Sequence, residues 1–365
     1  MSRPSLRRTP KLESLETRQV LSSVAGPSAD KQYVLEMINL VRTNPSAAAD
    51  RFTNNLSNDV QATLKQYGLS ADGLRSDLKS AASLPPLAYS DALDGTAQGQ
   101  SQDEAAMGKQ THTGANGSSL GDRLKSANYN LATAGENTYA YANNVDQAMQ
   151  SFLFDWGVAN RGHYKNLLQP GVSAGKAYKD VGIGLVNSRG NGVGPLVITT
   201  DFGSEQNEGP QIVGVVYTDK NHDNFYTPGE GQGGVTLTAT DSSGKAYSVQ
   251  SWQSGGYQIA VPGGSDYTVT ASVNGQVIQS HTVHVDDVNV KTDFVMDGTP
   301  PPVVVPIAAP TPAPTPAPAP VKVAIQAAVA VPVAVPAATT PDNSSNSPTW
   351  LARWSRWNAI DSSNG

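Results

Sequence analysis

The spacing of apolar residues changes twice along this chain of 365 residues, and the change restricts the folds open to it. From Tyr33 onward, apolar residues recur at intervals of three and four, the spacing of amphipathic helices. After Gly209-Pro210, short β-type runs alternate with Gly, Asn and Asp, and a Pro-rich stretch follows Gly298. The chain is therefore expected to combine a mixed region, an all-β region and an extended segment.

The mixed region is predicted to begin with helices. The first apolar stripe is formed by Val34, Met37, Ile38 and Val41. Asn44-Pro45-Ser46 interrupts it, and the helix restarts over 47–56 because proline is tolerated in a first helical turn. Residues 57–83 indicate one or two further short helices, with Gly68 and Gly73 as stops.

Three later helices and two strands complete this region. Ser90 is predicted to cap a helix over 91–107 and Ser118 or Ser119 one over 120–126, while the spacing over 145–154 is helical. The segments that indicate paired strands are Val181–Val186 and Leu196–Phe202. Helices flanking an antiparallel sheet make an α-β-α sandwich, so the predicted fold class is α+β.

The residues able to do chemistry gather between His112 and His163. The chain has five histidines, and two of them bound this window, with Glu136 and Asp155 between them. Two imidazoles and two carboxylates brought together would make a divalent-metal site or an acid/base cluster. Two ordinary surface histidines are the alternative interpretation.

The order and flanks of these four residues resemble the CAP family of cysteine-rich secretory proteins, venom antigens and pathogenesis-related proteins, also called the SCP domain. The matching segments are Thr111-His112-Thr113-Gly114, Gly135-Glu136-Asn137, Asp155 and Gly162-His163, with outer matches at 37–42 and 181–185. The acidic residue of the later helix is usually Glu in the animal members of the family, and the side chain of Asp155 is one methylene shorter. The resemblance covers roughly residues 32 to 205, about half the chain, and implies the α-β-α fold.

The resemblance also implies a ligand cleft formed by His112, Glu136, Asp155 and His163. Zinc would be held there by the imidazoles of His112 and His163, with water and one carboxylate completing an open shell. Glu136 could instead act as a base on bound water. The ligands suggested by the family are lipid, sterol or cell-wall related.

A calcium-loop pattern opens the all-β region, which is predicted to be a small β-sandwich of about 90 residues. Positions 1, 3, 5, 7, 9 and 12 of the loop are Asp219, Asn221, Asp223, the carbonyl of Phe225, Thr227 and Glu230. Position 6, usually glycine, is Asn224. Asparagine also tolerates a left-handed backbone, so the loop conformation is still open to this sequence. The pattern resembles the B-type repeats of bacterial surface adhesins, which have a prealbumin-like sandwich. An acidic hairpin without metal is the alternative.

The predicted division of the chain is a disordered export-type segment (1–30), the CAP-type domain (31–208), the β-sandwich (209–298), a Pro/Ala-rich linker (299–349) and a Trp/Arg tail (350–365). The first segment resembles the front of many exported planctomycete proteins, with its Leu-Glu-x-Leu-Glu-x-Arg-x-x-Leu-Ser motif. The apolar run Val321–Ala338 contains Pro332, Pro336, Lys322 and Gln326, which argue against a membrane span.

The net charge and the cysteine content of the chain exclude some classes of function. A net charge of −6 without dense Lys/Arg stretches argues against a nucleic-acid partner, and the absence of cysteine excludes disulfide bonds. The leading hypothesis is an exported envelope or extracellular protein whose cleft binds a metal and an unknown small ligand or envelope component. The alternatives are a metal-assisted hydrolase of peptide or envelope polymer with Glu136 as base, although no convincing nucleophile is present, and a purely structural or adhesion protein.

Overall fold

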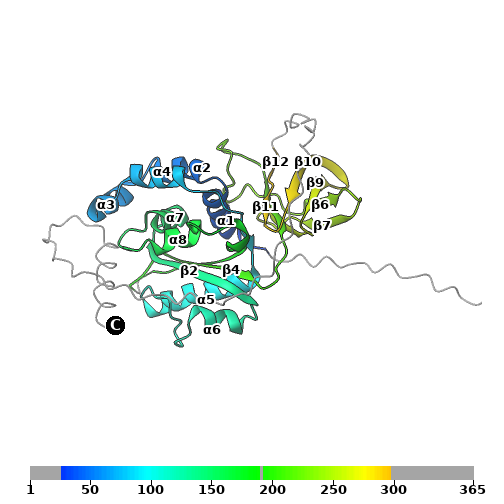
Figure 1. Cartoon of the computed structure of the whole chain (residues 1–365). Coiled ribbons are helices and arrows are strands. Elements are labelled where there is room, and N and C mark those ends of the chain that lie inside the picture. The colour runs from blue at the N-terminus through cyan, green and yellow to red at the C-terminus, as the bar shows by residue number, and fades with distance from the viewer. Residues whose placement is uncertain (1–25, 190–191, 297–365) are drawn as a thin grey trace, which may run out of the picture.

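The computed structural model describes residues 26–189 and 192–296. The predictions for most of the N-terminal segment, the linker, its apolar run and the Trp/Arg tail lie outside these residues. Within the described residues, no helix combines the length and the apolar character needed to cross a membrane. The fold is α+β, as predicted: a mixed domain is followed by an all-β domain (Figure 1).

A four-stranded sheet forms the middle layer of the first domain. Its order is β1 (Ala88–Tyr89), β3 (Asp180–Asn187), β4 (Leu196–Glu205) and β2 (Leu131–Ala142). β1 pairs in parallel with β3, whereas β4 pairs antiparallel with both β3 and β2. Strand β4 lies centrally, and its buried side chains include Val197, Ile198 and Phe202.

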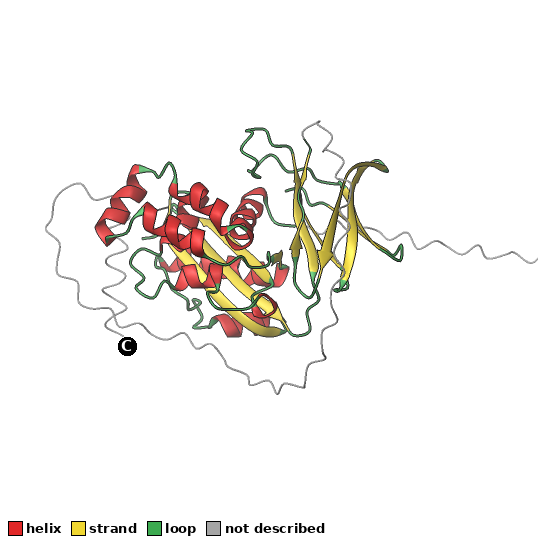
Figure 2. Ribbon diagram, turned by 45° about the horizontal axis from the view of Figure 1, so that its top comes forward, coloured by secondary structure: helices red, strands yellow, loops and turns green. Residues whose placement is uncertain are grey.

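Helices cover both faces of this sheet (Figures 1 and 2). The helices are α1 (Ala29–Thr43), α2 (Pro45–Thr53), α3 (Asn58–Tyr67), α4 (Ala71–Ser80), α5 (Asp91–Met107), α6 (Leu120–Ser126), α7 (Val145–Phe154), α8 (Gly162–Leu168) and the 3-10 turn η1 (Ala174–Lys176). Helices α5 and α6 lie on one face, and α1, α7 and α8 lie on the other (Figure 1). The predicted α-β-α sandwich is confirmed.

Two glycines of β3 allow α5 to pack closely on the sheet. A Cβ at Gly182 would lie 2.0 Å from the backbone of Leu93, and one at Gly184 would lie 2.2 Å from the Ala97 carbonyl oxygen. Side chains at either position would push the helix away from the strand. The Val-Gly-Ile-Gly-Leu stretch is therefore a packing surface for α5.

Most of the predicted helix boundaries are confirmed, because they depend on local caps. Ser90 caps α5, Ser119 forms a capping box at α6, and Gly68 ends α3 in a left-handed conformation with φ 65°. The prediction that Gly73 stops a helix is wrong, since Gly73 lies inside α4. Its backbone N–H instead donates to Oγ of Ser70, the residue that caps the start of that helix.

The second domain is a sandwich of two small sheets around a shared core (Figure 2). One sheet has the order β10 (Gln276–Val285), β9 (Ser265–Val273), β6 (Thr236–Asp241) and β7 (Ala246–Gln250). The other sheet has the order β11 (Val290–Lys291), β5 (Gln211–Tyr217) and β12 (Phe294–Val295), and β8 (Gly256–Ala260) also pairs with β5. Both β11 and β12 pair in parallel with β5. The sequence did not predict β7, whose side chains alternate between exposed and partly buried.

The two domains share a polar and apolar interface. Tyr217 and Tyr226 belong to the core of the first domain. The Lys291 ammonium lies 2.8 Å from the Glu36 carboxylate of α1; Glu36 is buried and Lys291 is largely buried. The Asn289 amide donates to the backbone carbonyls of Pro86 and Lys179. These buried contacts fix the position of the sandwich on the first domain.

Candidate functional site

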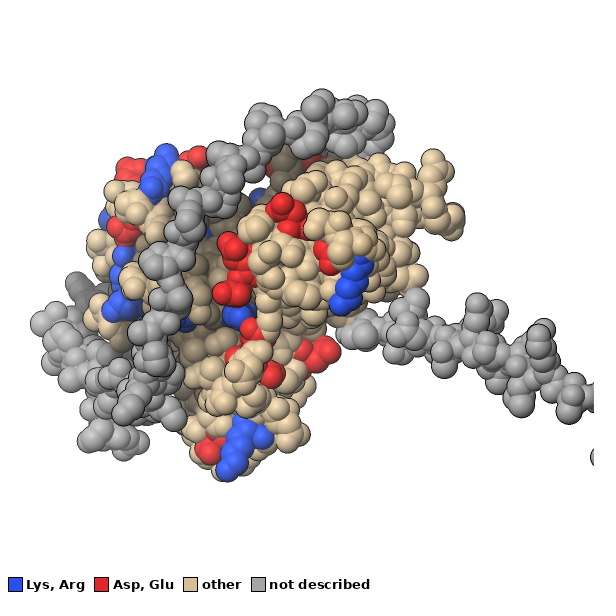
Figure 3. Space-filling model, turned by 45° about the vertical axis from the view of Figure 1, so that its right-hand side comes forward, with Lys and Arg blue, Asp and Glu red and all other residues tan. Residues whose placement is uncertain are grey.

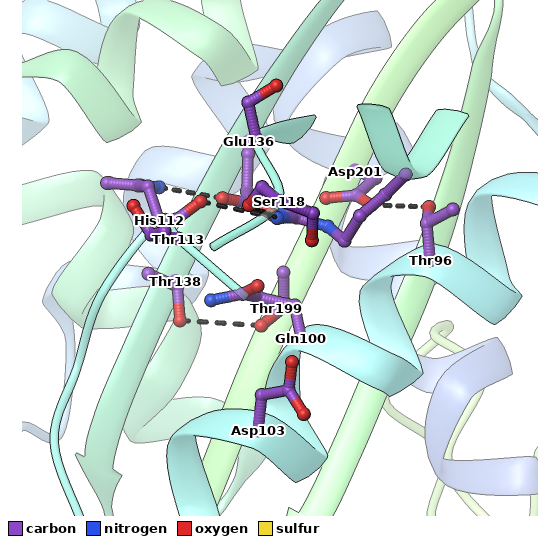
Figure 4. A network of polar contacts seen from close by, with 12 residues as sticks. Thr96, Gln100, Asp103, His112, Thr113, Ser118, Glu136, Thr138, Thr199 and Asp201 are labelled. Atoms are coloured by element: carbon purple, nitrogen blue, oxygen red, sulfur yellow. Dashed lines mark hydrogen bonds and ion pairs between the residues drawn. The ribbon is translucent and has the colours of Figure 1, made fainter. Parts of the chain in front are cut away.

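The first histidine–carboxylate pair joins the loop after α5 to strand β2. The Nδ1 atom of His112 lies 2.8 Å from Oε1 of Glu136. The two side chains differ in exposure: 56% of the His112 side chain is accessible, compared with 4% of Glu136. Glu136 lies in the middle of β2, and the sheet fixes its position. Figure 4 shows His112 and Glu136 facing one another.

Arg123 of α6 contacts both members of this pair. Its Nη2 forms an ion pair with Oε2 of Glu136, and its Nη1 donates to the backbone carbonyls of His112 and Ser118 at 3.3 and 3.2 Å. The Arg123 side chain is only 10% exposed. Arg123 is not among the residues predicted from the sequence, because nothing in the spacing of a short amphipathic helix distinguishes a site arginine from a surface one.

A second carboxyl group lies beside Glu136 on the neighbouring strand. Asp201 of β4 is directly opposite Glu136 in the antiparallel register, and Thr96 of α5 donates to its Oδ2 at 2.6 Å (Figure 4). Burial raises the pKa of Asp201 well above its usual range, and the neighbouring Glu136 carboxylate raises it further. Both effects favour the uncharged, protonated form of Asp201.

The second pair, Asp155 with His163, is more enclosed. Oδ1 of Asp155 lies 2.8 Å from Nδ1 of His163, and Oδ2 accepts from the backbone N–H groups of His163 and Tyr164 at 2.8 and 3.2 Å. Asp155 thus caps the start of α8 from eight residues upstream, where the adjacent Arg161 provides no side-chain cap. Asp155 follows α7 in a left-handed conformation with φ 53°, and its carboxylate is fully buried.

Two asparagines connect the pairs. The Asn166 amide of α8 donates to the Glu136 carbonyl at 3.1 Å and to Oδ1 of Asn137 at 2.8 Å. The Asn137 amide donates to the His163 carbonyl at 3.1 Å. The four predicted residues are therefore held as two pairs by a common hydrogen-bond network at β2 and α8.

The zinc prediction concerns the two imidazoles of this network. Among the described residues, no group of three or more His, Asp or Glu side chains is arranged to hold a metal ion. His112 and His163 each use Nδ1 for a carboxylate, which is how proteins orient an imidazole to bind a metal through Nε2. Zinc at these two imidazoles therefore stays a prediction, in which water or ligand would fill the remaining positions.

The predicted calcium loop is curled by its own side chains. Asp219 accepts from the backbone N–H groups of Asp223 and Asn224, and Glu230 accepts from those of Lys220 and Thr227. The predicted left-handed backbone at Asn224 is confirmed by a φ of 56°. The carboxylate, amide and carbonyl oxygens of the loop are the hard donors that calcium prefers.

This loop also touches the first domain. The Arg51 guanidinium of α2 lies 3.9 Å from the centre of the Phe225 ring, and its Nη1 is 3.7 Å from Oδ2 of Asp223. The ring of Tyr33 packs edge-on against Phe225 at 6.0 Å. The loop is therefore part of the interface between the domains.

An open groove of about 570 Å³ lies away from both pairs. It is lined by Thr53, Asn55, Leu56, Gln61, Leu64, Lys65, Leu69, Ser70 and Ala71. These residues come from α2, α3, α4 and their connections, whereas the histidine–carboxylate pairs lie at β2, at α8 and in the connections that follow α5 and α7. The groove and the pairs are separate features of the domain.

The layered fold and the two pairs define an α-β-α domain with a histidine–carboxylate site. Residues 35–202 match the profile of the cysteine-rich secretory protein family, CAP, and this part of the chain is a CAP domain. A comparison with curated proteins gives no match.

Two solved structures overlap part of the chain. An extracellular SCP-domain protein of Bacillus anthracis is 23% identical over 42% of this chain, with a TM-score of 0.28. An outer surface protein of Borrelia burgdorferi is 15% identical over 40% of this chain and 93% of its own, with the same TM-score. The overlap spans 45% of the Bacillus protein. At TM-scores this low, neither superposition supports an inference about this chain.

Proposed function

We propose that this protein is a binding module that acts outside the cytoplasm, in the cell envelope or the extracellular space. The main support is a pair of equal contacts: Nδ1 of His112 and Nδ1 of His163 each lie 2.8 Å from a carboxylate oxygen. Each contact orients its imidazole so that Nε2 is the nitrogen offered to a metal or to a polar ligand group. The shared asparagine network supports a single ligand site.

The geometry favours binding over hydrolysis. A general base needs a carboxylate oxygen directed at the proton it removes. In Glu136, Oε1 is engaged by His112 and Oε2 by Arg123, and the side chain is only 4% exposed. Glu136 is therefore a positioned acceptor that holds its two partners, which is the role expected in a binding site.

The proposed ligand class and location rest on two further observations. Membership of the CAP family supports a lipid, sterol or cell-wall component as ligand, and the leader-like motif of the N-terminal segment supports export. On the face shown in Figure 3, the basic side chains of the described residues lie in small separate groups. That distribution supports the proposal that nucleic acid is not the partner.

Zinc titration of the full-length protein tests this proposal. The whole chain is needed because Tyr217 and Tyr226 of the sandwich complete the core of the CAP domain. In calorimetry, we expect one zinc site, weakened at least about tenfold by His112→Gln or His163→Gln. His284→Gln, on the exposed edge of the sandwich, is the matched control and should bind as the parent does. Equal binding by all four proteins would reject the paired imidazoles as the site.

We further propose that the loop from Asp219 to Glu230 binds calcium and stiffens the sandwich. The support is its set of hard oxygen donors and the left-handed backbone at Asn224. We expect calcium to raise the melting temperature of the parent but not of Asp219→Asn or Glu230→Gln. Asp287→Asn, an exposed acid outside the loop, should respond as the parent does. A shift of similar size in every variant would indicate non-specific binding and contradict the proposal.

A further inference from the structure

Arg123 brings together three parts of the candidate site. Its guanidinium contacts the Glu136 carboxylate on β2 and two backbone carbonyls of the loop that carries the exposed imidazole, those of His112 and Ser118. A guanidinium presents five N–H donors in a fixed plane, so it can hold several acceptors in one geometry. A lysine at this position would bring the charge without that fixed plane.

The position of His112 depends on this contact. Its side chain is 56% exposed, and it lies in the loop between α5 and α6 rather than in a helix or strand. The contact from its Nδ1 to Glu136 keeps the ring in place, and the bond from Arg123 to its own carbonyl keeps the backbone near β2. Loss of the guanidinium would free the backbone of His112 and would leave the carboxylate that holds its ring without an ion-pair partner.

The same contact sets the tautomer of the imidazole. A carboxylate paired with a guanidinium accepts hydrogen bonds and donates none, so Nδ1 of His112 must carry the proton toward Glu136. Nε2 is then the unprotonated nitrogen. An imidazole in this form can accept a hydrogen bond or bind a metal through Nε2.

From these contacts we infer that Arg123 is the positioning residue of the ligand site, holding His112 as the Nδ1-protonated tautomer with Nε2 available. The role of Arg123 in ligand binding rests on the proposed function. Its effect on the His112 ring can be tested without any ligand. The residue acts through Glu136 and the loop.

The test uses the ¹⁵N chemical shifts of the His112 ring in the full-length protein at a pH where the ring is neutral. We expect the parent to show mainly the Nδ1–H tautomer. Arg123→Gln should bring the two nitrogen shifts toward the averaged values of a free imidazole, and Arg123→Lys should lie between the two. Lys125→Gln, an exposed cation on the same helix, is the control and should leave the shifts unchanged.

Each outcome bears on a different claim. A purely structural arginine would lower the melting temperature of Arg123→Gln without moving the ring shifts, and that result would overturn the inference. If the shifts move but the parent binds no zinc, the positioning role stands and the metal part of the proposed function fails. If the parent ring already shows averaged shifts, the inference is wrong whatever the variants do.

Discussion

The two histidine–carboxylate pairs have equal contact distances but are held in different ways. His163 is 12% exposed, and its partner Asp155 is fixed by two backbone N–H groups at the start of α8. His112 is 56% exposed, and its partner Glu136 is held by the side chain of Arg123. One half of the site is thus built into the backbone, whereas the other depends on side chains from a loop and a short helix. The enclosed pair is expected to contribute to stability and the exposed pair to ligand binding.

The largest predicted effect is at Asp155. Asp155→Ala removes the acceptor for two backbone N–H groups and for Nδ1 of His163, and it also places alanine at φ 53°. We expect the free energy of unfolding to fall by about 3 kcal/mol, measured by chemical denaturation. Asp155→Asn tolerates the left-handed backbone and keeps one acceptor oxygen, so it should lose roughly half as much. A cost below about 1 kcal/mol for the alanine variant would contradict the capping role.

The next effect concerns the acid behind the exposed pair. Because burial raises the pKa of Asp201, the folded state binds this proton more tightly than the unfolded state. The stability contributed by this group is present at pH values below about 4 and is lost as the pH rises toward the folded pKa. Asp201→Asn removes this dependence, so its stability relative to the parent should increase with pH, by at most about 1.4 kcal/mol per pH unit. Denaturation curves at pH 5, 6 and 7 measure the difference, and parallel curves would show that Asp201 is already ionised.

The smallest predicted effects separate the two imidazoles directly. His163→Ala removes a ring that lies 5.2 Å from that of Phe152 and should cost about 1.5 kcal/mol. His112→Ala removes a mostly exposed ring and should cost less than about 0.5 kcal/mol. Melting temperatures of the two variants, recorded side by side, test the comparison. Equal losses would mean that the exposed pair is as much a part of the folded core as the enclosed one.

The sequence predicted the elements of this fold better than the contacts of the site. Ser90 and Ser119 mark helix starts because a cap acts within three residues, and the α-β-α order follows from the apolar spacing. The position of Asp201 beside Glu136 depends on the register of β2 against β4, which pairs residues far apart in the chain. No local pattern carries that register.

The resemblance to the CAP family pointed to the four candidate residues but not to how they are held. It led us to expect one cluster, whereas the structure places them as two pairs connected by Asn137 and Asn166. The loop at Asn224 was predicted more closely, since the backbone conformation of position 6 depends on the residue type at that position. Contact of this loop with Arg51 was not predicted, because it crosses between domains.

The parallel pairing of β11 and β12 with β5 has a mechanical consequence. Strand β5 leads out of the CAP domain, and the chain leaves the sandwich just after β12. Tension between the two ends of the described chain would pull these neighbouring strands in opposite directions along their length. Their hydrogen bonds would then be loaded together in shear instead of opening one after another. The ion pair from Lys291 to Glu36 crosses the same junction, so a pulled molecule should hold its CAP domain and sandwich together until several contacts break at once.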